Sequence, residues 1–545
     1  MEVIRQISRF SARPAVVAKG LTFRYHDILA GASSIARDVH LATATRHKLQ
    51  DQFTGPRVAI YAPPGRHYVE ATWGAWLAGG IAVPLCLTHP HKELQYVLDD
   101  AQVAVLLTTP EHEAELAPLA HQAGADLRLL RTQERGVGTA PGVEQLLANA
   151  RPPHSLAQWP DACGALIVYT SGTTGRPKGA LHTHGSLAAH VSALVDAWAW
   201  REDDRILHAL PLHHVHGVIN ALHCAHAAGA AVEFLPNFSP AHVWGCLMRE
   251  EDAVTVFMGV PTMYAYLLNA YDAMAPAQQA AARAAAARLR LTVSGSAACP
   301  LPTMQRWEEL SGQRLLERYG MTETNMILSN PYEGERRPGS VGLPLPGVEV
   351  RAIADPAYDE DSGAASSDGV VARPGELRVR GPNLFREYWN QPDATAEAFD
   401  EDGWFRTGDT GVLDGSPPYW RILGRSSVDI IKSGGYKISA LGVENVLLAH
   451  PRVAECAVVG LPDDMQGERV VAIIAYSGEP VTLEELQRFT AGELPAYQLP
   501  RQLRIVDGLP RNAMGKVNKK QLVRDLFAVE PAARVRDAHD LDHAH

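Results

Sequence analysis

The sequence predicts an α/β fold with more than one domain. Short apolar segments alternate with helical stretches, and a chain of 545 residues is longer than a single hydrophobic core usually supports. Hydrophobic residues make up 46% of the chain and charged residues 20%, as in globular proteins that fold in water. The formal net charge of −11 argues against a general nucleic-acid binder, although it leaves room for a local basic pocket.

Segments in the first third carry the patterns of strands and helices. RVAIYA (57–62), VAVLLTT (103–109) and ALIVYT (165–170) are short apolar runs and are expected to be strands. WGAWLAGGIAVPLCL (73–87) is the most apolar segment, but glycines and Pro84 interrupt it. It is also shorter than the roughly 20 residues that a membrane helix needs. We therefore expect a helix that runs into a strand, and no membrane span.

Later segments predict a surface helix and two polar stretches. APAQQAAARAAAARL (275–289) is rich in alanine, the best helix former, and predicts an exposed helix. The stretch 353–375 is typical of a polar loop or hairpin between strands. The tail 534–545 is expected to be disordered, and a solvated tail is favoured over a metal site for its histidines, His539, His543 and His545.

The stretch YTSGTTGRPKGA (169–180) predicts an anion-binding loop. Its glycines let peptide N–H groups close around an anion, and Lys178 adds a compact positive charge. Phosphate is the expected ligand, and the alternative is a flexible surface turn. An ordinary P-loop is a poor match because Gly179 stands where that motif needs a hydroxyl. Further hydroxyl donors are Ser171, Thr173 and Thr174.

Two stretches are candidates for the lining of a pocket. LPLHHVHG (210–217) clusters three histidines without the carboxylate of a zinc protease motif, so a packed turn is the alternative interpretation. VSGSAA (293–298) is an expected strand end followed by small residues, which suggests backbone lying close to a ligand. The histidines are His213, His214 and His216.

Two further stretches carry groups suited to a nucleotide. ERYGMTE (317–323) places Tyr319, whose ring can stack on a base, near Thr322 and Glu323. Oxygens of this kind suit Mg²⁺ bound with phosphates. WFRTGD ends in Asp409, and a carboxylate can accept both hydroxyls of a ribose.

The last third holds three cations that follow an expected change of domain. GRSSVDIIKSGGYKI (424–438) contains two of them and PRNAMGKVNK (510–519) contains the third. They are Arg425, Lys437 and Lys516.

The cysteines indicate a reducing compartment. Six are scattered along the chain without a C-x-x-C pair, which disfavours both a disulfide framework and a zinc site. The first residues lack the apolar region of a secretory signal, although two early arginines leave a transit peptide as an alternative. We expect a cytoplasmic protein.

Five motifs together identify a family. YTSGTTGRPKG, YGMTE, TGD, GR…DIIKSGGYKI and PRNAMGK occur in this order over nearly the whole chain. They resemble the adenylate-forming superfamily of acyl-CoA synthetases, luciferases and peptide-synthetase adenylation domains. Within it, PLHHVHG, SGSAA, LLERYGMTE and SVDIIKSGGYKISA are most similar to the malonyl-CoA synthetases.

The resemblance implies an α/β architecture in two parts. A large N-terminal domain of helix-flanked sheets plus a small β-barrel would cover residues 1–424. A smaller, mobile α/β C-terminal domain would cover 425–545, with the hinge between Arg425 and Asp429. In relatives this domain turns between two half-reactions, which protects a reactive intermediate from water.

The resemblance also implies the residues that bind ATP or AMP. The loop would bind the pyrophosphate end, Thr322 would touch the α-phosphate, and Asp409 with Arg425 would hold the ribose. Mg²⁺ would bind Glu323 and Thr173. The whole expected nucleotide set is Thr170, Ser171, Gly172, Thr173, Thr174, Lys178, Ser296, Glu317, Tyr319, Gly320, Met321, Thr322, Asp409 and Arg425.

The catalytic residues implied by the resemblance are Lys516, Glu323, Thr322 and Lys437. Adenylation brings anions together, so it depends on positioning and on positive charge, which Lys516 would supply. In the second step the sulfur of CoA attacks the acyl-adenylate. Residues expected to face CoA are Lys437, Gly434, Gly435 and His214.

The expected acid substrate is malonate, with methylmalonate as a possible extension. Its distal carboxylate cannot be buried unpaired, and Arg318 can bind it through two hydrogen bonds. Ser296, His214 and His216 complete the expected substrate set. The alternative is that Arg318 pairs with Glu317 and only supports the loop. Relatives often carry a basic residue where this chain has Tyr266, and this departure weakens the prediction of malonate.

Three other functions remain open. The chain could use a short- or medium-chain monocarboxylate, load acyl groups onto a separate carrier protein, or bind nucleotide without catalysis. Retention of Lys516 and Glu323 disfavours the last, and the absence of a fused carrier domain disfavours the second. Thioester formation with free CoA distinguishes a CoA ligase from the carrier-loading and the noncatalytic alternatives.

Overall fold

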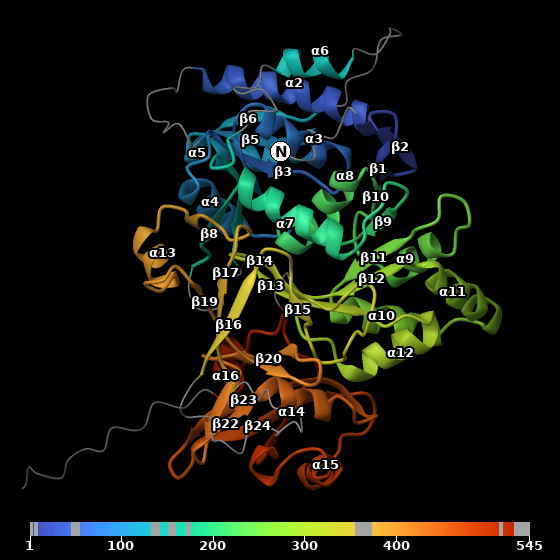
Figure 1. The fold of residues 1–545 in the computed structure, drawn as a ribbon, viewed down its shortest axis with the longest axis vertical. Helices are drawn as coiled ribbons and strands as arrows, with labels where there is room; N and C mark the ends of the chain where they lie inside the picture. Colours follow the sequence, from blue (N-terminus) through green and yellow to red (C-terminus); the bar gives the residue numbers. More distant parts are fainter. Residues whose placement is uncertain are drawn as a thin grey trace, which may run out of the picture. The chain divides into compact units, whose positions relative to one another are not determined.

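The computed structural model describes residues 4, 9–44, 55–131, 142–150, 160–170, 176–354, 373–511 and 516–527 (Figure 1). Packing divides the chain into two compact units, Met1–Ser427 and Val428–His545. Each unit has its own sheets and helices.

A nine-stranded sheet forms one layer of the first unit, in the order β15-β14-β13-β12-β11-β9-β10-β1-β2. The strands from β1 through β10, β9, β11 and β12 to β13 pair in parallel. Parallel strands place their carboxyl ends at one edge, where α/β proteins bind ligands. The strands are β1 (Pro14–Ala18), β2 (Leu21–Arg24), β9 (Arg205–His208), β10 (Ala231–Phe234), β11 (Val256–Gly259), β12 (Leu291–Ser294), β13 (Leu316–Met321), β14 (Asn325–Ser329) and β15 (Leu343–Pro344).

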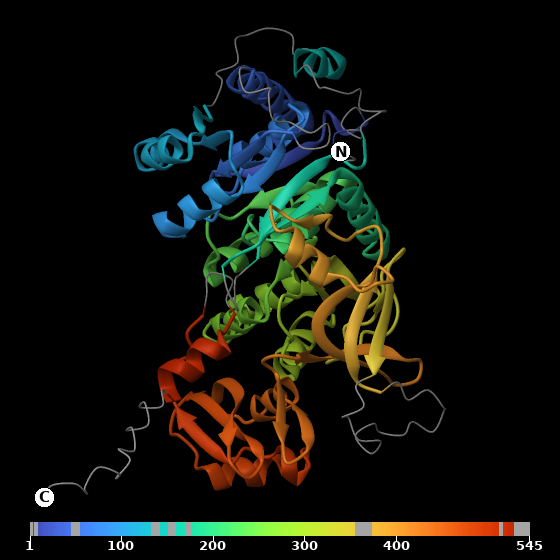
Figure 2. The same cartoon turned by 90° about the vertical axis from the view of Figure 1, so that its left-hand side faces the viewer.

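Helices cover this sheet in two groups. One group, drawn in green in Figures 1 and 2, packs helix against helix beside β11 and β12. It comprises α9 (Pro240–Leu247), α10 (Pro261–Asp272), α11 (Pro276–Arg288) and α12 (Leu301–Ser311). The other group comprises α7 (His184–Ala197), the π-helix η3 (His216–His223) and α8 (Cys224–Ala228).

A seven-stranded sheet forms the second layer, in the order β18-β8-β7-β4-β3-β5-β6. Successive side chains along one of its strands point into two different hydrophobic cores. Val58 and Ile60 belong to one core, whereas Ala59 and Tyr61 belong to the other. This is the period of two that a strand buried on both faces requires. The strands are β3 (Arg57–Tyr61), β4 (Ile81–Pro84), β5 (Val105–Thr108), β6 (Asp126–Leu129), β7 (Gly164–Tyr169), β8 (Gly179–Thr183) and β18 (Glu387–Tyr388).

Both faces of this second sheet are covered by helices. On one face α2 packs against α3 and α6, and on the other α4 packs against α5. Their bounds are α2 (Tyr25–Thr43), α3 (Arg66–Leu77), α4 (His91–Asp100), η1 (Pro110–His112), α5 (Glu113–Ala123) and α6 (Val143–Ala150).

A four-stranded antiparallel sheet completes the first unit, in the region where the small barrel is expected. Its order is β16-β17-β19-β20, and Figure 2 shows its strands in yellow and orange. The elements are β16 (Glu349–Ala354), β17 (Gly375–Arg380), α13 (Pro392–Ala398), β19 (Phe405–Asp414) and β20 (Tyr419–Arg425).

The second unit is a five-stranded sheet with a helix layer on each face. Val470 and Ala472 pack with α14 and α15, whereas Val471 and Ile473 pack with α16. The elements are β21 (Ile430–Ser433), β22 (Tyr436–Ser439), α14 (Ala440–Leu447), β23 (Val453–Asp463), β24 (Gly467–Tyr476), α15 (Leu483–Thr490), η5 (Ala496–Gln498), β25 (Gln502–Ile505) and α16 (Lys519–Phe527).

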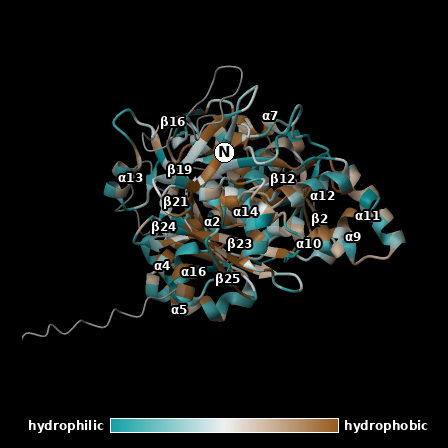
Figure 3. Cartoon of the chain, turned by 90° about the horizontal axis from the view of Figure 1, so that it is seen from below, coloured by the Kyte–Doolittle hydropathy of each residue, from teal (hydrophilic) through white to brown (hydrophobic). Residues whose placement is uncertain are grey.

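The expected α/β elements are confirmed. The segment 73–87 begins within α3 and continues into β4, and 275–289 corresponds to α11. Figure 3 shows hydrophilic residues along α11 and α13, which lie at the surface. Residues 355–372 and the tail with its three histidines lie outside the described residues. Among the described helices, none is long and apolar enough to cross a membrane.

Candidate active site

The hairpin of β13 and β14 forms the centre of the site. A Cβ on Gly320 would lie 2.0 Å from the carbonyl oxygen of Asn325, so this close crossing requires glycine. His182 on β8 supports the turn: its Nε2 donates to Thr322 O at 2.8 Å, and its Nδ1 accepts from Asn325 Nδ2 at 3.2 Å. Burial lowers the pKa of His182 to about 4, so the ring is neutral at pH 7.

Glu323 and Lys178 both contact Tyr388. The hydroxyl of Tyr388 donates to Glu323 Oε1 at 2.7 Å, and Lys178 Nζ lies 4.7 Å from the centre of the Tyr388 ring. Tyr388 reaches this position because β18 pairs with β8, which begins directly after Lys178. The sequence motifs did not point to Tyr388, since it lies outside all of them. The structure thus brings the loop cation and the hairpin carboxylate to one place.

The base of the loop is closed by two hydrogen bonds. The amide of Thr170 donates to Lys178 O at 2.9 Å, and the amide of Lys178 donates to Thr170 Oγ1 at 3.0 Å. The four remaining expected loop residues, Ser171, Gly172, Thr173 and Thr174, lie outside the described part of the chain.

Asp409 is held by two partners on different elements. Arg425 Nε lies 3.0 Å from its Oδ1, across the pair of strands β19 and β20. Tyr319 donates a 2.5 Å hydrogen bond to its Oδ2. Burial, followed by the charge of Asp409, raises the pKa of Tyr319 well above its ordinary value, so the phenol keeps its proton. A ribose diol at Asp409 would have to replace or share these two contacts.

Arg318 is a buried cation with unused donors. Only 5% of the residue is exposed, and its Nε and Nη2 have no hydrogen-bond partner among the described residues. Burial lowers its pKa to about 9, which still leaves it charged at pH 7. Buried N–H groups of a cation are costly when they bond to nothing. This site is therefore suited to an anion.

Two expected substrate residues lie near this cation. Ser296, at a φ of 71°, places its Oγ 3.4 Å from His216 Nδ1. Burial and then the charge of Arg318 lower the pKa of His216 well below its ordinary value, so the imidazole is neutral. Both side chains can donate a hydrogen bond next to the guanidinium without adding charge.

Glu317 points away from Arg318, as the alternation of side chains along a strand requires. Its Oε1 accepts from the amide of Cys299 at 2.9 Å, and burial raises its pKa to about 7. Within the described chain, no carboxylate forms an ion pair with Arg318. Glu317 therefore does not neutralise this arginine.

Two other expected residues, Met321 and His214, have simpler surroundings, as does Tyr266. Met321 pairs with Asn325 across the hairpin. The ring of His214 lies 4.1 Å from that of His213, measured between centroids. Tyr266, where relatives often carry a basic residue, is 52% exposed and stacks on Phe238.

The remaining expected catalytic residues belong to the second unit. Gly434 and Gly435 form the β21–β22 turn with φ values of 58° and 85°, which glycine adopts readily. Lys437 lies opposite Lys432 in this hairpin. Lys516 precedes α16, whose first residue is Lys519, with 10% of its side chain exposed. The relevant ion pairs join Lys519 Nζ to Asp429 Oδ1 and to Glu444 Oε1, each at 2.6 Å.

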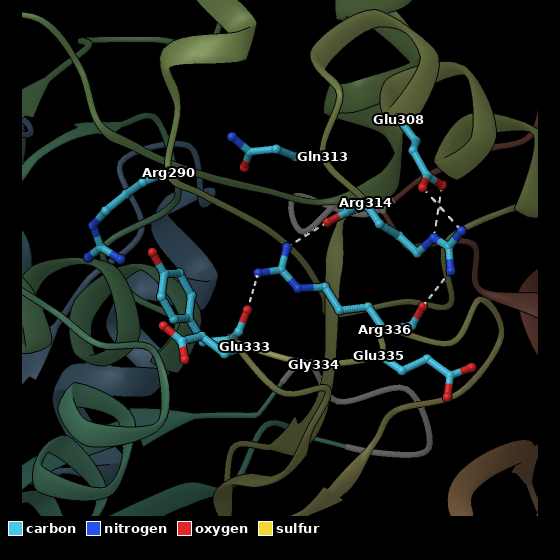
Figure 4. A pocket seen from close by; sticks show the side chains of 9 residues that line it. Arg290, Glu308, Gln313, Arg314, Glu333, Gly334, Glu335 and Arg336 are labelled. Carbon is cyan, nitrogen blue, oxygen red and sulfur yellow. Dashed lines mark hydrogen bonds and ion pairs between the residues drawn. The ribbon is translucent and has the colours of Figure 1, made fainter. Parts of the chain in front are cut away.

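A polar cavity of about 510 Å³ lies elsewhere on the first unit, beside Arg314, Arg336 and Tyr332 (Figure 4). Arg314 is bound by Glu308, and Arg336 donates to three backbone carbonyl groups. These guanidinium groups are already satisfied by the protein. Arg318 is therefore the better anion site.

Comparison with known families assigns the chain. Residues 4–389 match the family of AMP-binding enzymes, and residues 442–516 match the AMP-binding enzyme C-terminal domain. The chain belongs to the AMP-binding enzyme family. This confirms the resemblance to adenylate-forming enzymes that the five motifs indicated.

This AMP-binding enzyme has relatives along most of its length. It is 44% identical to malonate–CoA ligase ACSF3, mitochondrial, of Bos taurus, over 96% of this chain and 90% of the relative. The crystal structure of ATP-bound MatB from Rhodopseudomonas palustris is 33% identical, with a TM-score of 0.80 over 96% of this chain and 98% of that one. A malonyl-CoA ligase ternary product complex with methylmalonyl-CoA and AMP is 39% identical, with a TM-score of 0.63 over 92% and 97%.

Proposed function

We propose that this AMP-binding enzyme is an ATP-dependent malonate–CoA ligase. It forms malonyl-adenylate with release of pyrophosphate, and then malonyl-CoA with release of AMP. The observation that carries the choice of acid is Arg318, whose buried guanidinium has unused N–H groups. The names of the bovine relative and of the ternary complex, a malonate–CoA ligase and a malonyl-CoA ligase, support the same assignment.

In the proposed first half-reaction, one malonate carboxylate attacks the α-phosphorus of ATP and pyrophosphate leaves. Lys516 would stabilise the charge that develops on the transferring oxygens, and Thr322 would contact the α-phosphate. Lys178, with the loop that Thr170 closes, would hold the pyrophosphate end. These roles rest on the family motifs, and for Lys178 also on its position beside Tyr388 and Glu323.

A magnesium ion fits the donor set of this site. Glu323 and Thr173 would hold it, and Mg²⁺ bound there would neutralise phosphate charge. The Tyr388 hydroxyl bond to Glu323 Oε1 would then fix the orientation of the carboxylate, as partners of metal ligands commonly do.

The nucleoside would bind beside Asp409. Its carboxylate would accept the ribose hydroxyls, with Arg425 oriented by the 3.0 Å contact described above. The Tyr319 ring would pack on the adenine, with Ser296, Glu317, Gly320 and Met321 lining the nucleotide.

In the second half-reaction, the CoA sulfur attacks the acyl carbon, the bond to the adenylate oxygen breaks, and AMP leaves. We assign Lys437, Gly434 and Gly435 to the face that completes this step, with a mobile C-terminal domain from residue 425 onward that alternates between the steps. His214 would border the pantetheine.

Malonate places its distal carboxylate at Arg318, with Ser296 and His216 as neutral donors. Methylmalonate adds one methyl group to the same dicarboxylate, and we propose it as a second substrate, supported by the product bound in the ternary complex. A short- or medium-chain monocarboxylate would leave the Arg318 donors unsatisfied.

A panel of acids with ATP, Mg²⁺ and free CoA tests the proposed function. We expect rapid CoA-dependent release of AMP with malonate, slower release with methylmalonate, and little with acetate or butyrate. Equal rates for butyrate and malonate would reject the choice of acid. Adenylation without transfer to free CoA would instead favour a separate carrier protein as acceptor.

We also propose a cytoplasmic or otherwise reducing location, since all six cysteines are free. The bovine relative carries the word mitochondrial in its name. Localisation of the tagged full chain in its own cells distinguishes these compartments.

A further inference from the structure

Three side chains from two distant segments form a cluster beside His214, a residue expected at the site described above. Cys86 and His89 follow β4, whereas His213 precedes η3. One donor atom from each residue lies within 4.8 Å of the donor atoms of the other two. These segments are more than a hundred residues apart in the sequence, so only the fold brings them together.

The spacing of the donors fits a small metal ion. Zinc bonds of about 2.3 Å to sulfur and about 2.0 Å to nitrogen place tetrahedral ligand atoms roughly 3.3–3.6 Å apart. Atoms no more than 4.8 Å apart therefore need to move inward by less than about 1 Å each. Side-chain rotation alone supplies displacements of this size.

The donor types of the cluster suit a metal. A cysteine sulfur binds metals as the thiolate, and imidazole nitrogens are common zinc ligands. One thiolate with two imidazoles favours Zn²⁺ over Mg²⁺, which prefers oxygen ligands.

The surroundings of the two histidines also suit metal binding. His213 Nε2 is buried and has no hydrogen-bond partner within the described structure. His89 Nδ1 lies 3.4 Å from the carboxylate of Glu93, a residue of α4. A carboxylate beside a ligating histidine fixes the orientation of the ring, and this pairing recurs in zinc sites.

We infer that Cys86, His89 and His213 form a zinc-binding site with three protein ligands. The fourth position is left for water or for Thr88, whose Oγ1 lies 3.3 Å from Cys86 Sγ. The ion would tie the connection after β4 to the segment that carries His214 and His216. The inference does not depend on which acid the enzyme uses.

Zinc titration of the chelator-treated full chain, in competition with a chromogenic chelator, measures this affinity. We expect one tight site per chain, weakened at least about 100-fold in Cys86→Ser and in His213→Gln. Glu93→Gln should weaken it about 10-fold, as expected for loss of a partner that orients a ligand. Matched controls, Cys163→Ser and the exposed His91→Gln, should bind zinc as the wild type does.

Cobalt substitution identifies the ligands. Co²⁺ bound at this site should show thiolate-to-cobalt charge-transfer absorption, which Cys86→Ser abolishes. Histidines of the C-terminal tail carry no sulfur, so binding there gives no such absorption. The proposal is overturned if the absorption is absent, if it persists in Cys86→Ser, or if the wild type and both ligand variants bind zinc equally.

Discussion

The guanidinium of Arg318 lies directly against Gly295. A Cβ at Gly295 would come 2.3 Å from Arg318 Cζ and 2.4 Å from its Nε. Contacts this short do not occur, so a side chain at this position would displace the guanidinium. The glycine that directly follows β12 therefore helps to position the cation.

Gly295→Ala should lower kcat/KM for malonate by at least about tenfold, because the displaced guanidinium no longer faces the distal carboxylate. Use of butyrate should change much less. Gly245→Ala is a matched control, since a Cβ there meets no atom within 4 Å. A Gly295→Ala enzyme with unchanged malonate kinetics would show that the close packing has no part in substrate binding.

Tyr388→Phe should raise the Mg²⁺ concentration needed for half-maximal adenylation by about tenfold. The substitution keeps the ring beside Lys178 but removes the hydroxyl that orients Glu323. Titration with Mg²⁺ at fixed ATP measures this, and Tyr96→Phe, whose hydroxyl bonds Pro177 O instead, is the control. Identical Mg²⁺ dependence in both variants would reduce Tyr388 to a packing residue.

Lys516→Ala should abolish adenylation yet spare transfer from supplied malonyl-adenylate to CoA. The reason is that the cation is required where charge develops on phosphate and carboxylate oxygens. The two half-reactions are assayed separately, by pyrophosphate exchange and by thioester formation. Equal loss of both would refute the proposed division between Lys516 and Lys437.

The unfolding free energy of the first unit should fall steeply below pH 6.5. Burial holds the pKa of each of several histidines at about 3 to 4, so they stay neutral in the folded state. The unfolded chain binds protons that the folded chain does not, and each such group contributes about 1.4 kcal/mol per pH unit between pH 6.5 and 4. The histidines are His182, His190, His208, His223 and His226.

Urea unfolding between pH 7.5 and 5 measures this slope as a proton uptake. The five histidines should together contribute about five protons to this slope, and it should fall by about one in His190→Gln, where the new amide on α7 can still bond Asn220 Oδ1. An unfolding free energy that does not vary between pH 7.5 and 5 would contradict the burial of these histidines in their neutral form.

The sequence was most informative where a function depends on consecutive residues. Short apolar runs predicted β3, β5 and β7, and the motifs predicted Arg318 and Glu323 as site residues, but the hairpin that carries them was seen only in the structure. Tyr388 could not be predicted in this way, because its contact with Glu323 depends on the pairing of β18 with β8. The cluster of Cys86 with His213 was missed for the same reason, and the cysteine spacing argued against a metal site.

The most direct test of the central claim is the selectivity of Arg318→Ala for malonate over butyrate. Removing one partner of a buried charge pair costs on the order of 3 kcal/mol, so kcat/KM for malonate should fall more than about 100-fold. Butyrate places a methyl group at the same point and should be used equally well or better, so the preference inverts. If both acids lose the same factor, Arg318 only supports the hairpin, and the assignment of malonate is contradicted.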